Sequence, residues 1–523
     1  MRAINSLLSI VVTIGLFVLA LEGGLRLLGF GPTATIIQFD ETLGWSKTPG
    51  VRASRSTDEY DVTLEINELG LRDDPMESPE KPGGTFRVVM LGDSFVQGYT
   101  VDREDLFVDQ LETWWRAEGR SVDVVNAGTE AWATDQEVIW LQENGGAFDP
   151  DLVLLFTYDN DLFWNAKRKY LRTPKPRFHP EGRVEPRVLT DPGPRPWTDN
   201  YAVTKATKML GRRLGLVPNP SPTFEHESGR RMYCERAAYL HTPPEFMKEA
   251  YLRTEGALIA LKGACEELDV PLYVVPIPNK ATFGGKPAQQ LAGKLGLDAE
   301  LWSADQPVDT VLDLCAQHEI PTFDVRSALE AEVADGAQLY YEKDFHLNAE
   351  GNRALTRFLH AKLDDEGVFM PLYAPERAAE GPEALEGSGG LPTPVKVFAV
   401  LWLLLGVMYT LTYRDEKAWL APLKVGGLLL LIFTIFFALR WFADALPYPF
   451  DQFVFLAFVI TILTFVLYKL GHRVGTITEL FGCFVKRGHW YLMPLVVVLL
   501  TIGSLLVVAA SSPLVAPFIY TLF

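Results

Sequence analysis

Four apolar runs, rich in valine and leucine and separated by helical patterns, most constrain how this chain can fold. The runs cover residues 87–91, 122–125, 151–156 and 271–275. Their nearly continuous hydrophobicity is typical of strands that are buried on both faces of a parallel sheet. Because parallel strands need crossover connections, the helical patterns between them, such as 104–117 and 248–267, complete an α/β arrangement. The sequence therefore predicts an α/β domain built on a parallel sheet.

Polar residues follow three of these predicted strands directly. Gly92-Asp93-Ser94 follows the first strand, Asn126-Ala127-Gly128 the second, and Tyr158-Asp159-Asn160-Asp161 the third. Ligands of open α/β sheets bind at the carboxyl ends of the strands. We therefore expect Ser94, Gly128 and Asn160 to meet in one crevice.

A fourth string, Asp344-Phe345-His346, precedes a helical pattern over 353–363 and completes the groups that acyl transfer requires. Ser94 is the predicted nucleophile, His346 the general base and then acid, and Asp344 the carboxylate that orients the imidazole. The backbone N–H groups of Ser94 and Gly128 and the side-chain amide of Asn160 are the predicted oxyanion donors. Each string alone is common in turns and caps, but their joint occurrence at strand ends favours catalysis over an inactive binding protein of the same fold.

These four blocks resemble those of the SGNH/GDSL hydrolase superfamily, over about residues 35–370. Ser94 in GDSF, Gly128 in NAGTEAW, Asn160 in YDND and His346 in DFHLNAEG match the Ser, Gly, Asn and His of the family. The resemblance implies a flavodoxin-like, three-layer fold. Two upstream segments, 40–45 and 66–75, are similar to the lead-in of bacterial extracytoplasmic members.

Two positions depart from the family pattern. The usual last block is Asp-x-x-His, but position 343 is lysine, so Asp344 stands two residues before His346. This Asp-x-His spacing resembles the alginate O-acetyltransferase branch. In the third block, Tyr158 stands where the family has glycine.

Apolar segments at both ends of the chain predict a membrane protein. Residues 4–21 form an apolar run behind Arg2 that is long enough for an uncleaved anchor, with a cleaved signal peptide as the alternative. Four further apolar segments, compatible with membrane helices, cover 397–413, 420–439, 453–468 and 491–510. The predicted organisation is an anchor at 1–30, an SGNH hydrolase-like domain at 31–375, a linker at 376–394 and a membrane region of about four helices at 395–523.

Basic residues between the predicted spans set their orientation. Arg414, Lys417, Lys469 and Arg473 fall on one side if the N-terminus is cytoplasmic, which agrees with the positive-inside rule. The expected location is the bacterial cytoplasmic membrane, with the catalytic domain on the extracytoplasmic, periplasmic side. Residues from about 476 to 523 resemble a small bacterial membrane-protein family of unknown function.

An insertion at 162–246 follows the third predicted strand and is rich in proline and in basic residues, which include Lys167, Arg168, Lys169, Arg172, Lys175, Arg177, Arg183 and Arg187. Lys167, Arg168 and Lys169 are candidates for binding an anionic glycan beside the crevice; an ordinary solvated surface is the alternative. The formal net charge of −18 disfavours nucleic acid as a partner. The histidines show no metal-ligand spacing, so neither a metal nor a cofactor is predicted.

The sequence leaves three functions open. The first is a membrane-anchored serine O-acyltransferase that modifies an exported polysaccharide or envelope glycan and takes the acyl group from a membrane partner protein. The second is a carbohydrate esterase that uses the same acyl-serine intermediate. The third is a scaffold of an envelope-assembly complex. In the transferase a sugar hydroxyl attacks the acyl-serine, and in the esterase water does. The sequence does not decide between these two reactions.

Overall fold

The computed structural model describes residues 35–57, 59–193, 200–213 and 221–369, together with residues 22, 217, 402, 426, 427, 430 and 434. The chain divides into two compact units. One comprises Thr33–Arg195 and Pro218–Leu385, and the other comprises Met1–Pro32, Pro196–Val217 and Glu386–Phe523. The insertion at 162–246 therefore contributes residues to both units.

A four-stranded parallel sheet is the centre of the first unit, with the strands in the order β12-β7-β5-β6. The strands are β5 (Phe86–Leu91), β6 (Val122–Asn126), β7 (Leu152–Thr157) and β12 (Leu272–Pro276). All six residues of β5 and of β7 are buried, as the continuous apolar runs predict. This confirms the predicted parallel sheet. In chain order the strands stand 2-1-3-4, so the direction of winding reverses between β5 and β7.

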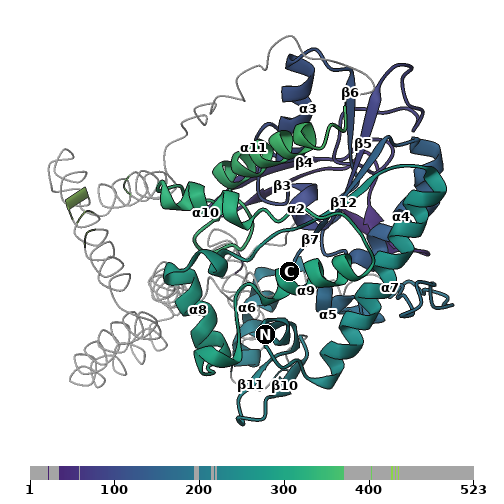
Figure 1. The fold of residues 1–523 in the computed structure, drawn as a ribbon. Coiled ribbons are helices and arrows are strands. Elements are labelled where there is room, and N and C mark those ends of the chain that lie inside the picture. Colours follow the sequence, from purple (N-terminus) through teal and green to yellow (C-terminus); the bar gives the residue numbers. More distant parts are fainter. Residues whose placement is uncertain are drawn as a thin grey trace, which may run out of the picture. The chain divides into compact units, whose positions relative to one another are not determined.

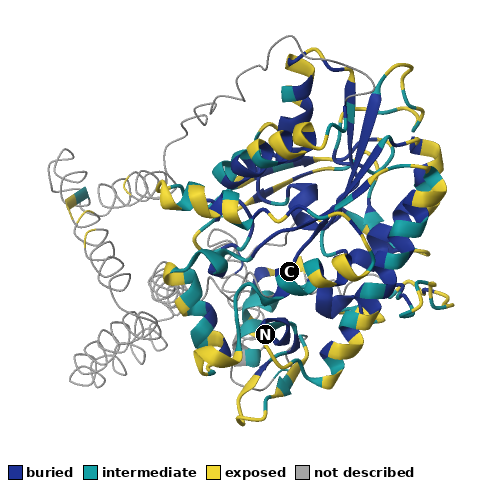
Figure 2. Ribbon diagram, in the orientation of Figure 1, coloured by how far each residue is buried: buried dark blue, intermediate teal, exposed yellow. Residues whose placement is uncertain are grey.

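Side chains that alternate along the strands enter two separate cores, one on each face of the sheet. Val89 and Leu91 of β5 belong to one core and Val88 and Met90 to the other. The first face is covered by α4 (Thr134–Phe148), α5 (Asp161–Trp164), α7 (Glu245–Leu268) and α9 (Gln306–Gln317). The second is covered by α3 (Phe107–Ala117), α10 (Arg326–Ala334) and α11 (Ala349–Asp365). Figures 1 and 2 show this buried sheet between helices whose exposed residues face outward.

Short antiparallel hairpins lie outside the central sheet. The lead-in segment forms β1 (Ile37–Asp40) with β2 (Gly44–Lys47), and β3 (Arg52–Ser56) with β4 (Asp61–Glu65). The insertion forms β8 (Lys169–Tyr170) with β9 (Thr173–Pro174), and β10 (Thr223–Glu225) with β11 (Arg231–Tyr233). The remaining helical elements of this unit are α2 (Ser94–Gln97), α8 (Gly285–Leu295) and the 3₁₀ turns η2 (Arg103–Asp105), η4 (Cys234–Tyr239), η5 (Lys280–Phe283) and η6 (Ala299–Leu301).

The second unit contains α6 (Ala202–Arg213). The carboxylate of Glu22 accepts hydrogen bonds at 3.0 Å from the backbone N–H groups of Ala202 and Val203, in the first turn of this helix. A carboxylate at a helix N-terminus satisfies otherwise unpaired donors and opposes the positive end of the helix dipole. Glu22 therefore joins the segment after the N-terminal apolar run to a helix of the insertion.

Most of the predicted membrane segments lie outside the described residues: the anchor at 1–30 apart from Glu22, the linker at 376–394, and the region at 395–523 apart from five single residues. Among the helices that are described, none has both the length and the hydropathy needed to cross a bilayer.

Candidate active site

The turn after β5 presents Ser94 at the first position of the short helix α2. The Asp93 carboxylate caps this helix by accepting a hydrogen bond from the Phe95 N–H at 2.8 Å. Glycine is required on the neighbouring loop, because a Cβ at Gly128 would lie 2.4 Å from the Gln97 backbone nitrogen and 2.6 Å from Val96 Cβ. The first and second predicted blocks are therefore packed against each other at the end of the sheet.

Ser94, His346 and Asp344 form a continuous hydrogen-bonded chain. The Ser94 Oγ atom lies 2.7 Å from His346 Nε2, and His346 Nδ1 lies 2.6 Å from Asp344 Oδ1. With Nδ1–H donating to the carboxylate, Nε2 is the atom that accepts the hydroxyl proton. The structure thus brings together the three residues that the sequence predicts, with the nucleophile, base and orienting acid in a workable geometry.

Burial and charge both act on the carboxylate of this chain. Asp344 is 2% exposed, His346 5% and Ser94 8%. Burial alone would raise the pKa of Asp344, but the charge and hydrogen bonds of His346 outweigh it and hold that pKa below its usual range. Asp344 is therefore an anion over the pH range in which most enzymes work, as the orienting role requires.

Aromatic rings surround the imidazole of His346. Tyr99 stacks on it at 5.3 Å between ring centroids, Phe345 at 4.2 Å, and Phe95 packs at 4.8 Å in a tilted arrangement. Tyr158, which replaces the glycine of the family pattern, stacks on Phe345 at 5.5 Å. Both departures from the family pattern, the short Asp-x-His loop and Tyr158, therefore meet in one aromatic cluster beside the base.

The three residues that are predicted to donate to the oxyanion lie at the ends of adjacent strands. Two of them, Gly128 and Asn160, make hydrogen bonds within the protein. The Gly128 N–H donates to Asn126 Oδ1 at 3.1 Å. The Asn160 carbonyl accepts from Phe163 and Trp164 at the start of α5, and its Oδ1 atom is buried without a hydrogen-bond partner among the described residues. Oxyanion stabilisation by Ser94, Gly128 and Asn160 stays a prediction.

A group of buried carboxyl groups lies behind the nucleophile turn. Burial raises the pKa of Asp93 to about 6, although the hydrogen bond from Phe95 and the charge of His346 oppose it. Burial, and then the negative charges of Asp161, Asp93 and Asp135, raise the pKa of Glu137 well above its usual value. One oxygen of Asp161 accepts the Tyr158 N–H at 2.9 Å and fixes the third-block turn. Asp93 and Asp161 thus support the loops that carry Ser94 and Asn160.

Lys167, Arg168 and Lys169 have three different surroundings. The Lys167 Nζ atom lies 4.4 Å from the centroid of the Phe163 ring, a cation–π contact. Arg168 forms an ion pair with Glu185, and Lys169 is exposed on β8. Two of the three basic side chains are thus engaged within the insertion, and substrate binding by them stays a prediction.

Three residues that the sequence analysis missed contact the Asp-x-His loop. The Tyr60 hydroxyl lies 3.4 Å from Asp344 Oδ2, the Glu59 carboxylate accepts backbone N–H groups of the loop, and the Lys280 ammonium donates to its carbonyl groups. Lys280 follows β12 closely, so its place at the end of a predicted strand is a usable signal. Glu59 and Tyr60 lie in a hairpin turn and have no comparable signal.

Tyr239, in the later part of the insertion, contacts the loop that carries Asn160. The Tyr239 hydroxyl, at the end of η4, donates to the Asp159 carboxylate, and Asn279 Nδ2 donates to the same oxygen at 3.0 Å. Asn279 Nδ2 also donates to the Tyr158 hydroxyl at 2.9 Å. The loop that carries Asn160 is therefore held by residues from the insertion and from the loop after β12.

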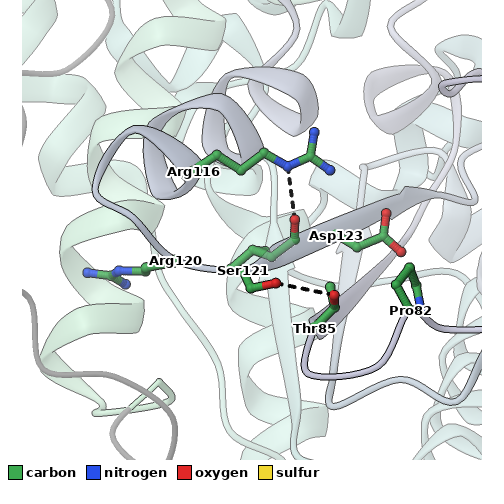
Figure 3. Close-up of a pocket in the computed structure, with 7 residues that line it drawn as sticks. Pro82, Thr85, Arg116, Arg120, Ser121 and Asp123 are labelled. Carbon is green, nitrogen blue, oxygen red and sulfur yellow. Dashed lines mark hydrogen bonds between the residues drawn. The ribbon is translucent and has the colours of Figure 1, made fainter.

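A cavity of about 320 Å³ lies at the opposite ends of the strands from Ser94. Its lining includes Thr85 and Ser121, which directly precede β5 and β6, and the Arg116 Nε–H donates to the Val122 carbonyl at 3.0 Å (Figure 3). Because the length of β5 separates this cavity from the nucleophile turn, it is not the place where an ester meets Ser94.

One group of possible metal ligands, Glu118, His360 and Asp364, is present in the described part of the chain, with ligand atoms within 4.8 Å of one another. Arg120 already supplies a positive charge there, at 2.5 Å from Asp364 Oδ1 and 2.9 Å from Glu118 Oε2. His360 stacks on Trp114 at 4.0 Å between ring centroids. An arginine between the carboxylates fits an ion-pair network, and we assign no metal to it.

Comparison with known proteins found a family model and several solved structures that are similar to parts of this chain. A family model described as a family of unknown function, DUF5989, matches residues 474–523, which agrees with the resemblance that the sequence predicts there. No curated protein matches the chain. The solved structure of TesA is similar at 12% identity, with 55% of this chain and 99% of that chain covered and a TM-score of 0.28. An acetyl xylan esterase, AlAXEase, is similar at 10% identity over 53% and 100% of the two chains, with a TM-score of 0.29. A lipase/acylhydrolase from Enterococcus faecalis is similar at 14% identity over 56% and 100%, with a TM-score of 0.29.

Proposed function

We propose that this chain is a membrane-anchored, extracytoplasmic serine O-acyltransferase that acts on an exported polysaccharide or another envelope glycan. The observation that carries the proposal is the hydrogen-bonded chain from Ser94 through His346 to Asp344. Ser94 Oγ attacks the carbonyl carbon of the acyl donor while His346 Nε2 takes its proton. The tetrahedral intermediate collapses to acyl-Ser94, and His346 gives the proton to the leaving oxygen.

The second half of the reaction decides between a transferase and an esterase. A glycan hydroxyl attacks the acyl-serine as His346 removes its proton, and Ser94 leaves as a hydroxyl. Water in place of the glycan gives hydrolysis through the same steps. The Asp-x-His spacing, which resembles the alginate O-acetyltransferase branch, supports transfer, and so does the predicted membrane anchor, which would keep the domain beside a membrane acyl donor.

A labelling experiment on the full chain in detergent tests the nucleophile. A serine-directed fluorophosphonate is expected to modify Ser94, and mass spectrometry of the tryptic peptide locates the label. Ser94→Ala should abolish labelling, whereas Ser54→Ala, on the β3 hairpin strand, should not change it. Labelling at another residue, or none on folded protein, contradicts the assignment of Ser94.

An acceptor experiment on the same protein then tests the reaction type. With p-nitrophenyl acetate as donor, added oligosaccharide should appear as acetylated product and should reduce the share of acetate released. If every turnover releases free acetate at all acceptor concentrations, the esterase is the correct function.

A further inference from the structure

The backbone of the Asp344-Phe345-His346 loop is held by an ammonium group from outside the loop. Lys280 Nζ donates to the carbonyl oxygens of Tyr341 at 3.0 Å, Glu342 at 2.9 Å and Asp344 at 2.8 Å. An ammonium group has three donor hydrogens, so the loop backbone uses all of them. Lys280 therefore fixes three peptide groups immediately before His346.

A carboxylate from the lead-in hairpin holds the other side of the same backbone. Glu59, in the turn between β3 and β4, accepts the Lys343 N–H on Oε1 and the Asp344 N–H on Oε2, both at 2.9 Å. The next residue, Tyr60, places its hydroxyl 3.4 Å from Asp344 Oδ2. Glu59 thus binds N–H groups, and Lys280 binds carbonyl groups, of the same short stretch of backbone, residues 341–344.

We propose that Glu59 and Lys280 are positioning residues that hold the shortened Asp-x-His loop in register with Ser94, an inference that rests on the proposed function. With one residue fewer than Asp-x-x-His, Asp344 Oδ1 accepts both the His346 N–H at 3.0 Å and the ring Nδ1–H at 2.6 Å. Both bonds depend on the backbone angles at 343–345. Residues that fix these peptides therefore fix the imidazole relative to Ser94 Oγ.

The test uses steady-state kinetics of the full chain with p-nitrophenyl acetate. Lys280→Met and Glu59→Gln should each lower kcat about ten- to a hundredfold, because small misplacements of catalytic groups have effects of this size, while KM stays within about twofold. Two matched controls act on side chains of the same region: Glu342→Gln, whose backbone carbonyl remains, and Lys286→Met, whose ammonium lies 3.4 Å from the Glu342 carboxylate. Both controls should keep wild-type kcat.

The pH profile separates positioning from a general loss of folding. Lys280→Met removes a positive charge that helps to hold the pKa of Asp344 below its usual range, so the acid limb of kcat/KM should move to higher pH. Glu59→Gln removes a negative charge, so the limb should move to lower pH. The other titratable groups that interact with the pair, Tyr60, Asp93, Tyr99 and Tyr341, are unchanged in both variants.

Lys280→Arg keeps the charge but not the three-carbonyl geometry, so kcat should fall while the acid limb stays in place. If Lys280→Met does not fold, kcat of Lys280→Arg and Glu59→Gln tests the inference instead. Wild-type kcat in folded Glu59→Gln and folded Lys280→Arg overturns the inference. Failure of the serine mechanism is distinct, because the wild-type chain itself would then lack turnover that depends on Ser94. Failure of transfer alone is also distinct, because every turnover of the wild type would then release free acetate.

Discussion

Glu137, a buried acid behind the nucleophile turn, links the stability of the fold to pH. It has no exposed surface, and neither carboxyl oxygen has a hydrogen-bond partner among the described residues. Burial and the neighbouring Asp161 and Asp93 raise its pKa well above 4.5. The folded state therefore binds this proton more tightly than the unfolded state. The stability linked to Glu137 is fully present below about pH 4.5 and is lost as pH rises toward the folded-state pKa.

Glu137→Gln should remove this loss, since glutamine keeps the shape and cannot ionise. We expect similar melting temperatures for the variant and the wild type near pH 4, and a higher melting temperature for the variant near pH 8. The linked free energy changes by about 1.4 kcal/mol for each pH unit between the two pKa values. Glu330→Gln, at an exposed position on α10, is the control and should show no such difference. A variant less stable than the wild type at pH 8 contradicts the assignment of a protonated Glu137.

The insertion is joined to the central fold by a buried ion pair at the start of α4. Lys175, directly after β9, places Nζ 2.7 Å from both carboxylate oxygens of Asp135 and 3.0 Å from the Trp164 carbonyl. Both side chains are 1% exposed. Burial raises the pKa of Asp135 to about 6 against the opposing charge of Lys175. Lys175 is therefore a structural residue and is not part of a solvent-facing basic strip.

Lys175→Met should destabilise the chain by about 3–5 kcal/mol, because it leaves a buried carboxylate without its partner. Chemical denaturation monitored by tryptophan fluorescence measures the loss. Adding Asp135→Asn should recover part of it, since the uncompensated charge is then gone. Lys169→Met, on the exposed side of β8, should change stability by less than about 0.5 kcal/mol. Equal effects at positions 169 and 175 contradict the structural assignment.

The sheet and the strand-end groups were predictable because buried parallel strands carry continuous apolar runs and end at one edge of the sheet. Ser94, Asn126, Gly128 and Asn160 follow such runs directly. Glu59 was not predictable, because its contact with Asp344 spans 285 positions of the sequence and has no periodic pattern. The ion pairs of the basic residues in the insertion were also not predictable from the sequence. A sequence counts charges without their partners, and Glu185 alone pairs with Arg168, Arg177 and Arg253.

The location of the whole molecule depends on its two ends, whose apolar segments predict one span before the catalytic domain and four after it. The basic residues after the second and fourth predicted spans favour a cytoplasmic position for those loops. The same orientation places Ser94 outside, where exported glycans are found. The proposed substrate therefore requires the predicted topology.

Fusion reporters on the full chain measure this topology. An alkaline phosphatase fusion after residue 380 should be active and a green fluorescent protein fusion there dark, because the first is active only outside the cytoplasm and the second fluoresces only inside it. The pattern should reverse near residue 480, which follows Lys469 and Arg473. Replacing both basic residues with glutamine should weaken the cytoplasmic signal at 480 and leave the signal at 380 unchanged, since the first span sets the orientation of the large domain. A fluorescent fusion at 380 places Ser94 in the cytoplasm. Acyl transfer by this triad would then have to act on a cytoplasmic ester, and an exported glycan would no longer be its substrate.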